Sequence, residues 1–210
     1  MEIRDFPHFE ADDQGRLRKG AWIQCYSGVK FWPLDPRVDE IHYDDICIGI
    51  AREGRYRNQT KVPYYVAEHS VIVSIYAGKL AQERGLDWQT CARQGLLHDA
   101  SEAYLGDVSR PVKRQPMMDG YRAAEEVLQN KIYERFGVHP TMDTTALVHE
   151  VDTRICKDEI DTLMPDPRMW PLAGRYAQVQ PLGATIACLT WRQAADAFSQ
   201  RFAELFEEVP

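Results

Sequence analysis

Apolar residues recur every three or four positions along most of this chain, which is the spacing of amphipathic helices. Glycines follow several of these segments, and glycine is a typical residue at which a helix ends. Pro63 suits the first turn of the second segment. The pattern predicts an all-α fold, with helices over residues 38–54, 63–85, 88–106, 121–137, 143–164 and 191–206.

Three segments lack a helical period. Residues 1–20 are polar and charged, and they predict an extension or irregular arm. Residues 21–38 are rich in aromatic side chains around Ser27-Gly28, which favours a short hairpin. Residues 165–183 are rich in Pro and Gly and predict a long loop. A loop of this length is compatible with a lid, an oligomer contact or irregular structure.

Composition limits the class of protein. A chain of 210 residues with 44% hydrophobic content can bury one sizeable core, and no linker-like segment divides it. We therefore expect a single domain over residues 21–210, after the extension at residues 1–20. The five cysteines are widely spaced and form no Cys-x-x-Cys pair, which is typical of reduced thiols in the cytoplasm. The sequence contains neither a signal peptide nor a long apolar run, so we expect no membrane partner.

The charge of the chain argues against polymeric nucleic acid as a partner. The formal net charge is −7, whereas binding to a phosphate backbone relies on a dense basic surface. A small phosphate ester needs only a local positive pocket. Two groups of basic residues could supply one: Arg110, Lys113 and Arg114, and Arg52, Arg55, Arg57 and Lys61.

The most informative polar residues are the doublet His98-Asp99, which directly follows Leu96-Leu97. Burying a carboxylate beside apolar residues costs several kcal/mol unless a cation or hydrogen bonds offset it. His69 and Asp152 lie on the predicted helices 63–85 and 143–164, so two imidazoles and two carboxylates could bind one divalent metal ion. This donor set suits Co, Mn, Fe, Ni, Zn or Mg. His149 is a competing ligand, because it lies one turn before Asp152.

Several sequence segments resemble those of a known protein family. The runs Val66-Ala67-Glu68-His69-Ser70 and His98-Asp99-Ala100-Ser101-Glu102-Ala103-Tyr104-Leu105-Gly106-Asp107 resemble HD-domain metal-dependent phosphohydrolases, in particular bacterial 5′-deoxynucleotidases and phage HD hydrolases. Val108-Ser109-Arg110-Pro111-Val112-Lys113 continues the resemblance. The segments Trp22-Ile23-Gln24 and Phe31-Trp32-Pro33-Leu34-Asp35-Pro36 are similar to phage members, which include dATP triphosphohydrolases. The resemblance spans residues 20–165 and implies an HD-domain helical bundle with a small irregular or hairpin N-terminal segment.

The resemblance also implies roles for individual residues. It places one divalent metal ion on His69, His98, Asp99 and Asp152, with Asp99 also able to orient a water molecule. Glu102 lies one helical turn after the doublet on the same side, where it can act as a general acid or base. The implied substrate-binding residues are Asp107 for a sugar hydroxyl, Arg55, Arg110 and Lys113 for phosphate, Tyr56 for the base or sugar, and Trp22 for stacking on the base.

The implied reaction is hydrolysis of a deoxynucleotide between the 5′-oxygen and the α-phosphorus. The products are a deoxynucleoside and either phosphate, from a dNMP, or triphosphate, from a dNTP. The phage-like N-terminal segment favours a dNTP such as dATP. The resemblance further implies a homo-oligomer, a dimer or larger, in the cytoplasm of a bacterium or of a phage-infected host.

Two other functions remain as alternatives. One is a cyclic-dinucleotide or alarmone hydrolase with the same metal core. The chain has neither a Gly-Tyr-Pro signature nor a Glu-Asp pair after the doublet, which counts against it. The other is a non-catalytic, metal-bound nucleotide sensor. The presence of Glu102 and Lys113 counts against a sensor.

Overall fold

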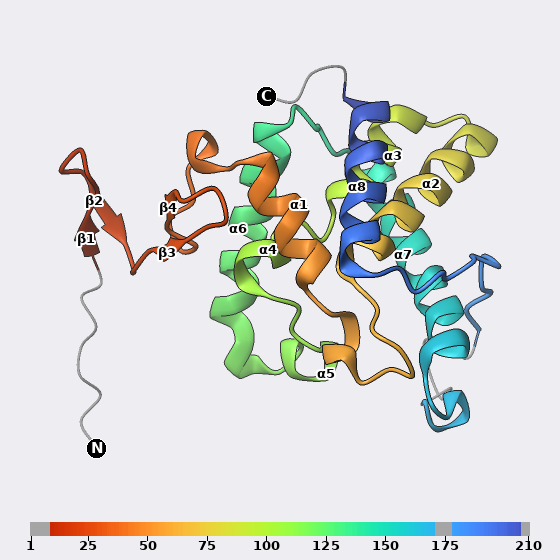
Figure 1. Ribbon diagram of the computed structural model, residues 1–210. Coiled ribbons are helices and arrows are strands. Elements are labelled where there is room, and N and C mark those ends of the chain that lie inside the picture. The colour runs from red at the N-terminus through yellow and green to blue at the C-terminus, as the bar shows by residue number, and fades with distance from the viewer. Residues whose placement is uncertain (1–8, 171–177, 207–210) are drawn as a thin grey trace.

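The computed structural model describes residues 9–170 and 178–206 of the chain, and it is a bundle of helices with two small hairpins at its N-terminal end (Figure 1). This confirms the predicted all-α class. The α-helices are α1 (Tyr43–Arg52), α2 (Val66–Arg84), α3 (Trp88–Leu97), α4 (Glu102–Leu105), α5 (Arg110–Lys113), α6 (Asp119–Arg135), α7 (Met142–Leu163) and α8 (Trp191–Leu205). Short 3₁₀ helices lie at η1 (Val38–Glu40), η2 (Arg55–Asn58), η3 (Pro116–Met118) and η4 (Pro167–Met169).

Helix α2 is central in the bundle and packs against α3, α7 and α8. Val66, Val73 and Ala77 on α2 have no exposed surface. Helix α3 lies very close to α2 at Gly95. A Cβ atom added to Gly95 would lie only 3.2 Å from the backbone of Ser74. Glycine at this position therefore lets α3, which ends directly before His98, come close to α2, which carries His69.

The ends of α2 agree only in part with the sequence prediction. Gly85 ends the helix in the left-handed conformation, with φ of 68°, as predicted. The start differs, since the helix begins at Val66 and Pro63 precedes it. The backbone before α2 is extended: Arg55 N donates to Tyr64 O at 2.9 Å, and Gly54 pairs with Tyr65. This pairing holds residues 63–65 outside the helix.

The predicted helix over residues 88–106 is interrupted. Helix α3 ends at Leu97, turns follow over residues 98–101, and α4 begins at Glu102. The cause lies in His98, whose Nδ1 is 2.7 Å from Gly95 O. In a continuous helix that carbonyl would accept from the backbone N–H of Asp99. The side chain of His98 replaces that bond, and the doublet therefore lies in a turn.

The other predicted helices are present with shifted ends. Helix α1 starts at Tyr43 rather than at residue 38, because the 3₁₀ helix η1 and an extended Ile41 precede it. Helices α7 and α8 each begin with a capping box, formed by Thr141 with Thr144 and by Thr190 with Gln193.

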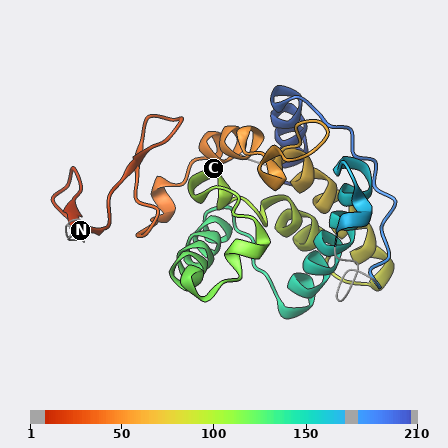
Figure 2. The ribbon, with the colours of Figure 1, turned by 90° about the horizontal axis from the view of Figure 1, so that it is seen from below.

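The N-terminal segments form two antiparallel hairpins that extend from one end of the bundle in both views (Figures 1 and 2). The hairpin predicted within residues 21–38 is present as β3 (Ile23–Gln24) paired with β4 (Lys30–Phe31). Residues 1–20 are predicted to be an extension or irregular arm, but residues 9–19 are not irregular, since β1 (Phe9–Ala11) pairs with β2 (Leu17–Lys19).

Arg18 fixes this N-terminal region. Its guanidinium is fully buried, contacts Asp35 at 2.8 Å and Glu40 at 2.5 Å, and lies 4.2 Å from the centre of the Trp32 ring. A buried arginine is stable only with such partners. The hairpins are therefore tied to η1 and to each other through one side chain.

The segment between α7 and α8 is anchored to the bundle by two carboxylates. Residues 171–177 lie outside the described part of the chain, and the connecting segment (residues 178–190) has no helix or strand. Glu68 of α2 accepts hydrogen bonds from the backbone N–H groups of residues 187, 188 and 189 at 2.7–3.0 Å. Asp158 of α7 accepts from Leu182 and Gly183. The predicted loop over residues 165–183 contains the 3₁₀ helix η4, and its described end at residues 178–183 is irregular and anchored to α7 through Asp158.

All five cysteines are free thiols. Among the described helices, none is long and apolar enough to cross a membrane.

Candidate metal centre and active site

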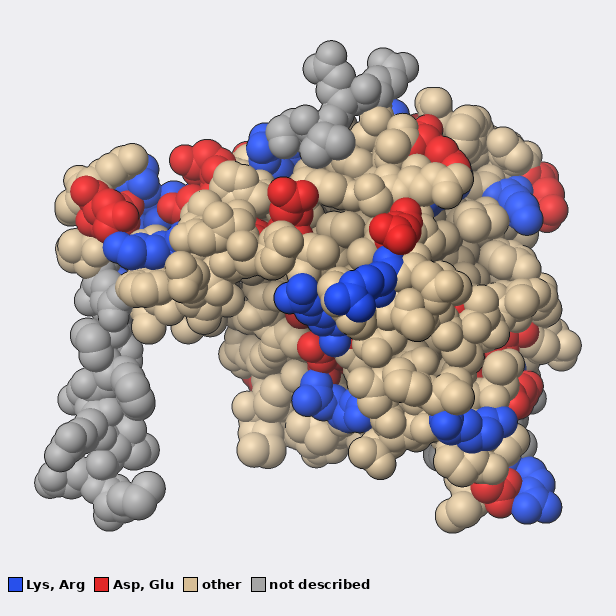
Figure 3. Space-filling view, in the orientation of Figure 1, with Lys and Arg blue, Asp and Glu red and all other residues tan. Residues whose placement is uncertain are grey.

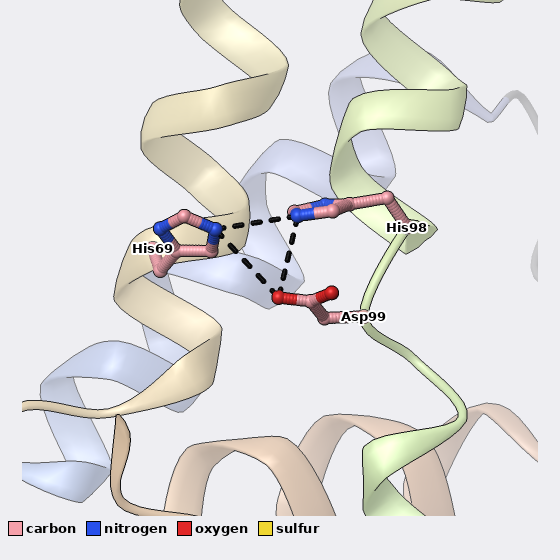
Figure 4. A group of neighbouring side chains, drawn as sticks. All are labelled: His69, His98 and Asp99. Atoms are coloured by element: carbon pink, nitrogen blue, oxygen red, sulfur yellow. Dashed lines mark hydrogen bonds and ion pairs between the residues drawn. The ribbon is translucent and has the colours of Figure 1, made fainter. Parts of the chain in front are cut away.

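Three predicted ligands converge between α2 and the end of α3 (Figure 4). The Nε2 atoms of His69 and His98 are 3.2 Å apart. Oδ2 of Asp99 lies 3.3 Å from Nε2 of His98 and 3.6 Å from Nε2 of His69. The ligand atoms of this triad all lie within 4.8 Å of one another. Asp152 of α7 joins the triad through His69, with Oδ1 at 3.2 Å from Nε2.

These separations fit a metal ion. Metal–ligand bonds of about 2.1 Å place adjacent ligand atoms roughly 3.0–3.4 Å apart in octahedral or tetrahedral geometry. The distances between neighbouring ligand atoms here are 3.2–3.6 Å. The second nitrogen of each ring also has a partner: Nδ1 of His98 is 2.7 Å from Gly95 O, and Nδ1 of His69 is 2.6 Å from Glu159 Oε1. Both Nε2 atoms are therefore oriented toward the cluster.

Glu159 is a site residue that the sequence prediction missed. It has no exposed surface and lies about two helical turns after Asp152 on α7. Besides His69, it accepts a hydrogen bond from the Tyr56 hydroxyl at 2.6 Å and lies 3.4 Å from Arg55 Nη2. Burial would raise the pKa of Glu159, but Arg55 and His69 lower it to about 2. The only sequence feature that could have indicated Glu159 is its position on the same face of the predicted helix as Asp152.

Glu102, the predicted acid or base, lies beside the cluster at the start of α4. It is only 6% exposed, and its Oε2 atom has no hydrogen-bond partner among the described residues. Burial raises the pKa of Glu102 well above its usual range, and the charges of Asp99 and Asp107 raise it further. Both effects favour the protonated form of Glu102, from which the carboxyl can donate a proton. A cation at the cluster would oppose this shift.

Arg55 and Tyr56 reach the site from an unusual backbone segment. Tyr56, Arg57 and Asn58 all have φ of 54–55°, a conformation that costs non-glycine residues about 1 kcal/mol or more each. Gly54 precedes them, and a Cβ added there would lie 2.1 Å from the end of the Asn58 side chain, which would have to move. The segment places Arg55 Nη1 3.0 Å from Asp99 Oδ2.

A cavity of about 360 Å³ opens beside the cluster. Its lining contains acidic, basic and aromatic side chains, and includes Arg55, Tyr56, Asp99, Glu102, Asp107, Arg110, Lys113, Arg114, Asp152, Cys156 and Trp170. Arg110 Nη2 lies 3.7 Å from Asp152 Oδ2, and Lys113 Nζ lies 2.5 Å from Glu125 Oε1. In Figure 3, Lys and Arg side chains gather over the lower middle of the bundle, where Figure 1 shows α5.

Two candidates from the sequence do not reach this cavity. Trp22 is 43% exposed on the N-terminal hairpins, where Lys30 Nζ lies 5.3 Å from its ring centre, and it is not among the cavity-lining residues. His149 is exposed and borders a different, open depression with Arg154 and Gln180. His149 therefore does not compete with Asp152. In contrast, Cys156 and Trp170 line the cavity without having been predicted.

A helical bundle that brings a histidine from one helix to a His-Asp doublet on the next has the architecture of the HD-domain hydrolases, a metal-dependent class. Comparison with models of protein families then identifies a particular family within this class. Residues 49–160 match the model described as 5′-deoxynucleotidase YfbR-like. This match covers just over half of the chain, and the chain belongs to that family.

Individual relatives are more distant. The chain is 26% identical over 187 residues to the uncharacterized protein YfdR of Escherichia coli, covering 89% of this chain and 97% of YfdR. It is 36% identical over 122 residues to an uncharacterized protein of Rhodobacter capsulatus, covering 57% of this chain and 60% of the relative. A shorter match, 36% over 78 residues, is to ribonuclease Y of Nitratidesulfovibrio vulgaris, covering 37% of this chain and 14% of that enzyme.

Proposed function

We propose that this protein is a metal-dependent 5′-deoxynucleotidase, which hydrolyses a deoxynucleoside monophosphate to the deoxynucleoside and phosphate. The observation that carries the proposal is that one cavity is lined by Asp99 of the His-His-Asp triad, by Asp152, by the buried carboxyl of Glu102 and by a set of basic side chains. The family supports this reaction class. The cavity volume of about 360 Å³ is near the lower end of the range for small-molecule sites, which suits one mononucleotide.

His69, His98, Asp99 and Asp152 would hold one divalent cation. When bound, this cation supplies a Lewis acid for the phosphoryl oxygens and lowers the pKa of water. Glu159 keeps the ring of His69 oriented with Nε2 toward the cluster. Asp99 lies between the cluster and the cavity, so its carboxylate can also orient the attacking water.

Glu102 acts as the general acid. Its carboxyl is buried against the cavity and carries an oxygen without a partner among the described residues, so it can donate a proton to the departing 5′-oxygen. Protonation of this oxygen is required because an alkoxide is a poor leaving group. Asp107, which is next to the Gly106 turn, accepts a hydrogen bond from the sugar 3′-hydroxyl.

Arg55, Arg110 and Lys113 bind the phosphate. All three line the cavity, and a guanidinium forms paired hydrogen bonds to phosphate oxygens. The left-handed segment that begins at Tyr56 fixes Arg55 before substrate arrives, which reduces the entropy lost on binding. Tyr56 follows Arg55 in the same wall and contacts the sugar or base.

A second candidate is a dNTP triphosphohydrolase, with dATP as a substrate. The observation in its favour is the row formed by Arg110, Lys113 and Arg114 along one wall of the cavity. This row could bind phosphates beyond the first. Both candidates share attack at the α-phosphorus and release of an intact deoxynucleoside.

One experiment tests the proposal and separates the two candidates. The protein is incubated with deoxynucleoside mono-, di- and triphosphates and with each of several divalent metals, and the products are resolved by chromatography. We expect dAMP to give deoxyadenosine and phosphate, with the phosphate labelled when the solvent is enriched in heavy oxygen. Release of equal amounts of deoxyadenosine and triphosphate from dATP would favour the second candidate.

Two results would contradict the proposed reaction. Stepwise appearance of dADP and dAMP from dATP would mean attack at the terminal phosphate and would refute the substrate orientation. Absence of turnover with every nucleotide and metal, in a protein that still binds the metal ion, would favour the nucleotide sensor instead.

A further inference from the structure

Trp170 lies at the cavity although it is outside the region that matches the family model. It directly follows η4, whose start is capped by the side chain of Asp166, and its backbone N–H donates to Pro167 O at 3.2 Å. The side chain is half-buried and packs beside Cys156, Ile160 and Met164. The position of the indole is thus fixed by α7 and by the short helix after it.

Tyr56 supports Trp170 from within the cavity wall. The two rings are perpendicular, with centres 5.9 Å apart, in the edge-to-face arrangement that aromatic pairs favour. Tyr56 itself is held by its hydroxyl, which donates to Glu159 at 2.6 Å, and by its left-handed backbone. Tyr56 is therefore a rigid support for Trp170, and both rings remain partly exposed at the cavity.

The cavity lining has a mainly charged part and an aromatic part. Around the metal cluster and α5 most of the lining side chains are acidic or basic, with Val108, Ser109 and Pro111 between them, and the charged groups suit a phosphate and a hydroxylated sugar. Tyr56 and Trp170 are the aromatic residues among those that line the cavity. The remaining part of a nucleotide is its base, a flat and largely apolar ring that binds best to an aromatic face.

We propose that Trp170, supported by Tyr56, stacks on the base of the nucleotide and makes the enzyme prefer purine over pyrimidine nucleotides. The inference rests on the proposed nucleotidase function and adds to it the group that binds the base. Purines have the larger ring surface, so they gain more from stacking. Loss of one stacking ring weakens binding by about 10- to 100-fold.

The test compares ligands with and without a base. Wild type, Trp170→Ala and Trp170→Phe are assayed with dAMP and dCMP, and deoxyribose 5-phosphate is measured as a competitive inhibitor. We expect Trp170→Ala to raise KM for dAMP about 10- to 100-fold with little change in kcat, to affect dCMP less, and to leave the inhibition constant of deoxyribose 5-phosphate unchanged. Trp170→Phe should restore most of the affinity for dAMP.

Two controls make the test specific. Met169→Ala changes the neighbouring side chain, which is 80% exposed and does not line the cavity, and it should leave all constants unchanged. Thermal unfolding shows whether each variant is folded. If Trp170→Ala does not fold, Trp170→Phe remains informative, because the smaller ring should still reduce the ratio of dAMP to dCMP in kcat/KM.

A binding measurement separates this inference from the proposed function. The product deoxyadenosine is not hydrolysed, and it should quench tryptophan fluorescence in wild type and much less in Trp170→Phe. Equal loss of affinity for dAMP and deoxyribose 5-phosphate in Trp170→Ala, or unchanged dAMP kinetics, would overturn the stacking role. If wild type hydrolysed no nucleotide, the proposed function would fail, and equal quenching in both proteins would overturn the stacking role independently.

Discussion

Glu159→Gln is expected to weaken the metal centre from a position that does not contact the metal ion. The substitution keeps the size of the side chain but removes its charge. The carboxylate now accepts from His69 Nδ1 and from the Tyr56 hydroxyl, both at 2.6 Å, and lies beside Arg55. A glutamine has one acceptor oxygen, so at least one of these bonds is lost. Loss of such an orienting carboxylate typically lowers metal affinity 10- to 100-fold.

The stability change follows from the pKa of Glu159. The folded protein lowers this pKa from 4.5 to about 2, which corresponds to about 3 kcal/mol of stability at neutral pH. Because the folded-state pKa is the lower one, this contribution is complete above pH 4.5 and is lost as the pH falls toward 2. About 2 kcal/mol of it should be lost by pH 3.

The assay is urea unfolding of chelated wild type and Glu159→Gln between pH 7 and pH 3, together with calorimetric titration of metal ion at pH 7. We expect the difference in unfolding free energy to shrink over this pH range. Asp161→Asn is the matched control, because Asp161 lies on the same helix, is 50% exposed and forms an ion pair with the neighbouring Lys157. Its effect should stay below about 0.5 kcal/mol. Metal affinity within twofold of wild type in Glu159→Gln would refute the orienting role.

Three further predictions concern the proposed active site. Chelation should abolish turnover, and His98→Ala or Asp99→Ala should lose metal ion in elemental analysis; full metal content and activity in either variant would contradict the ligand assignment. Glu102→Gln should keep its metal ion and substrate affinity while kcat falls about 100-fold, and a fall in metal content would instead make Glu102 a ligand. Lys113→Ala should raise KM for dATP more than for dAMP if the cavity accepts several phosphates, whereas equal effects would favour the monophosphatase.

The helices could be predicted because their signals are local. The apolar spacing and the glycine at position 85 located α2 and its end, and the motif around His98 indicated the His-His-Asp cluster that could hold a metal ion. The break after Leu97 was not predictable from spacing. It depends on a hydrogen bond from the His98 ring to Gly95 O, and helix propensity contains no information on that bond.

Glu159 and Trp170 were missed because their roles depend on contacts between distant segments. Glu159 meets His69 across 90 positions of the chain and Tyr56 across 103. Trp170 reaches the cavity through the turn after α7, in a segment whose Pro and Gly content indicated only a loop. The hairpin of β1 and β2 was missed for a related reason, since its alternation covers only three residues on each side.

The orientation of α2 about its axis affects two sites at once, because Glu68 and His69 are neighbours on this helix. These neighbours on one helix hold, respectively, the backbone N–H groups of residues 187–189 and the metal cluster. Any rotation of α2 that moved His69 would break the contacts of Glu68, and the reverse also holds. The connecting segment therefore restricts rotation of the helix that carries His69. We expect insertions there to shift His69, although they lie beyond residues 49–160, which match the family model.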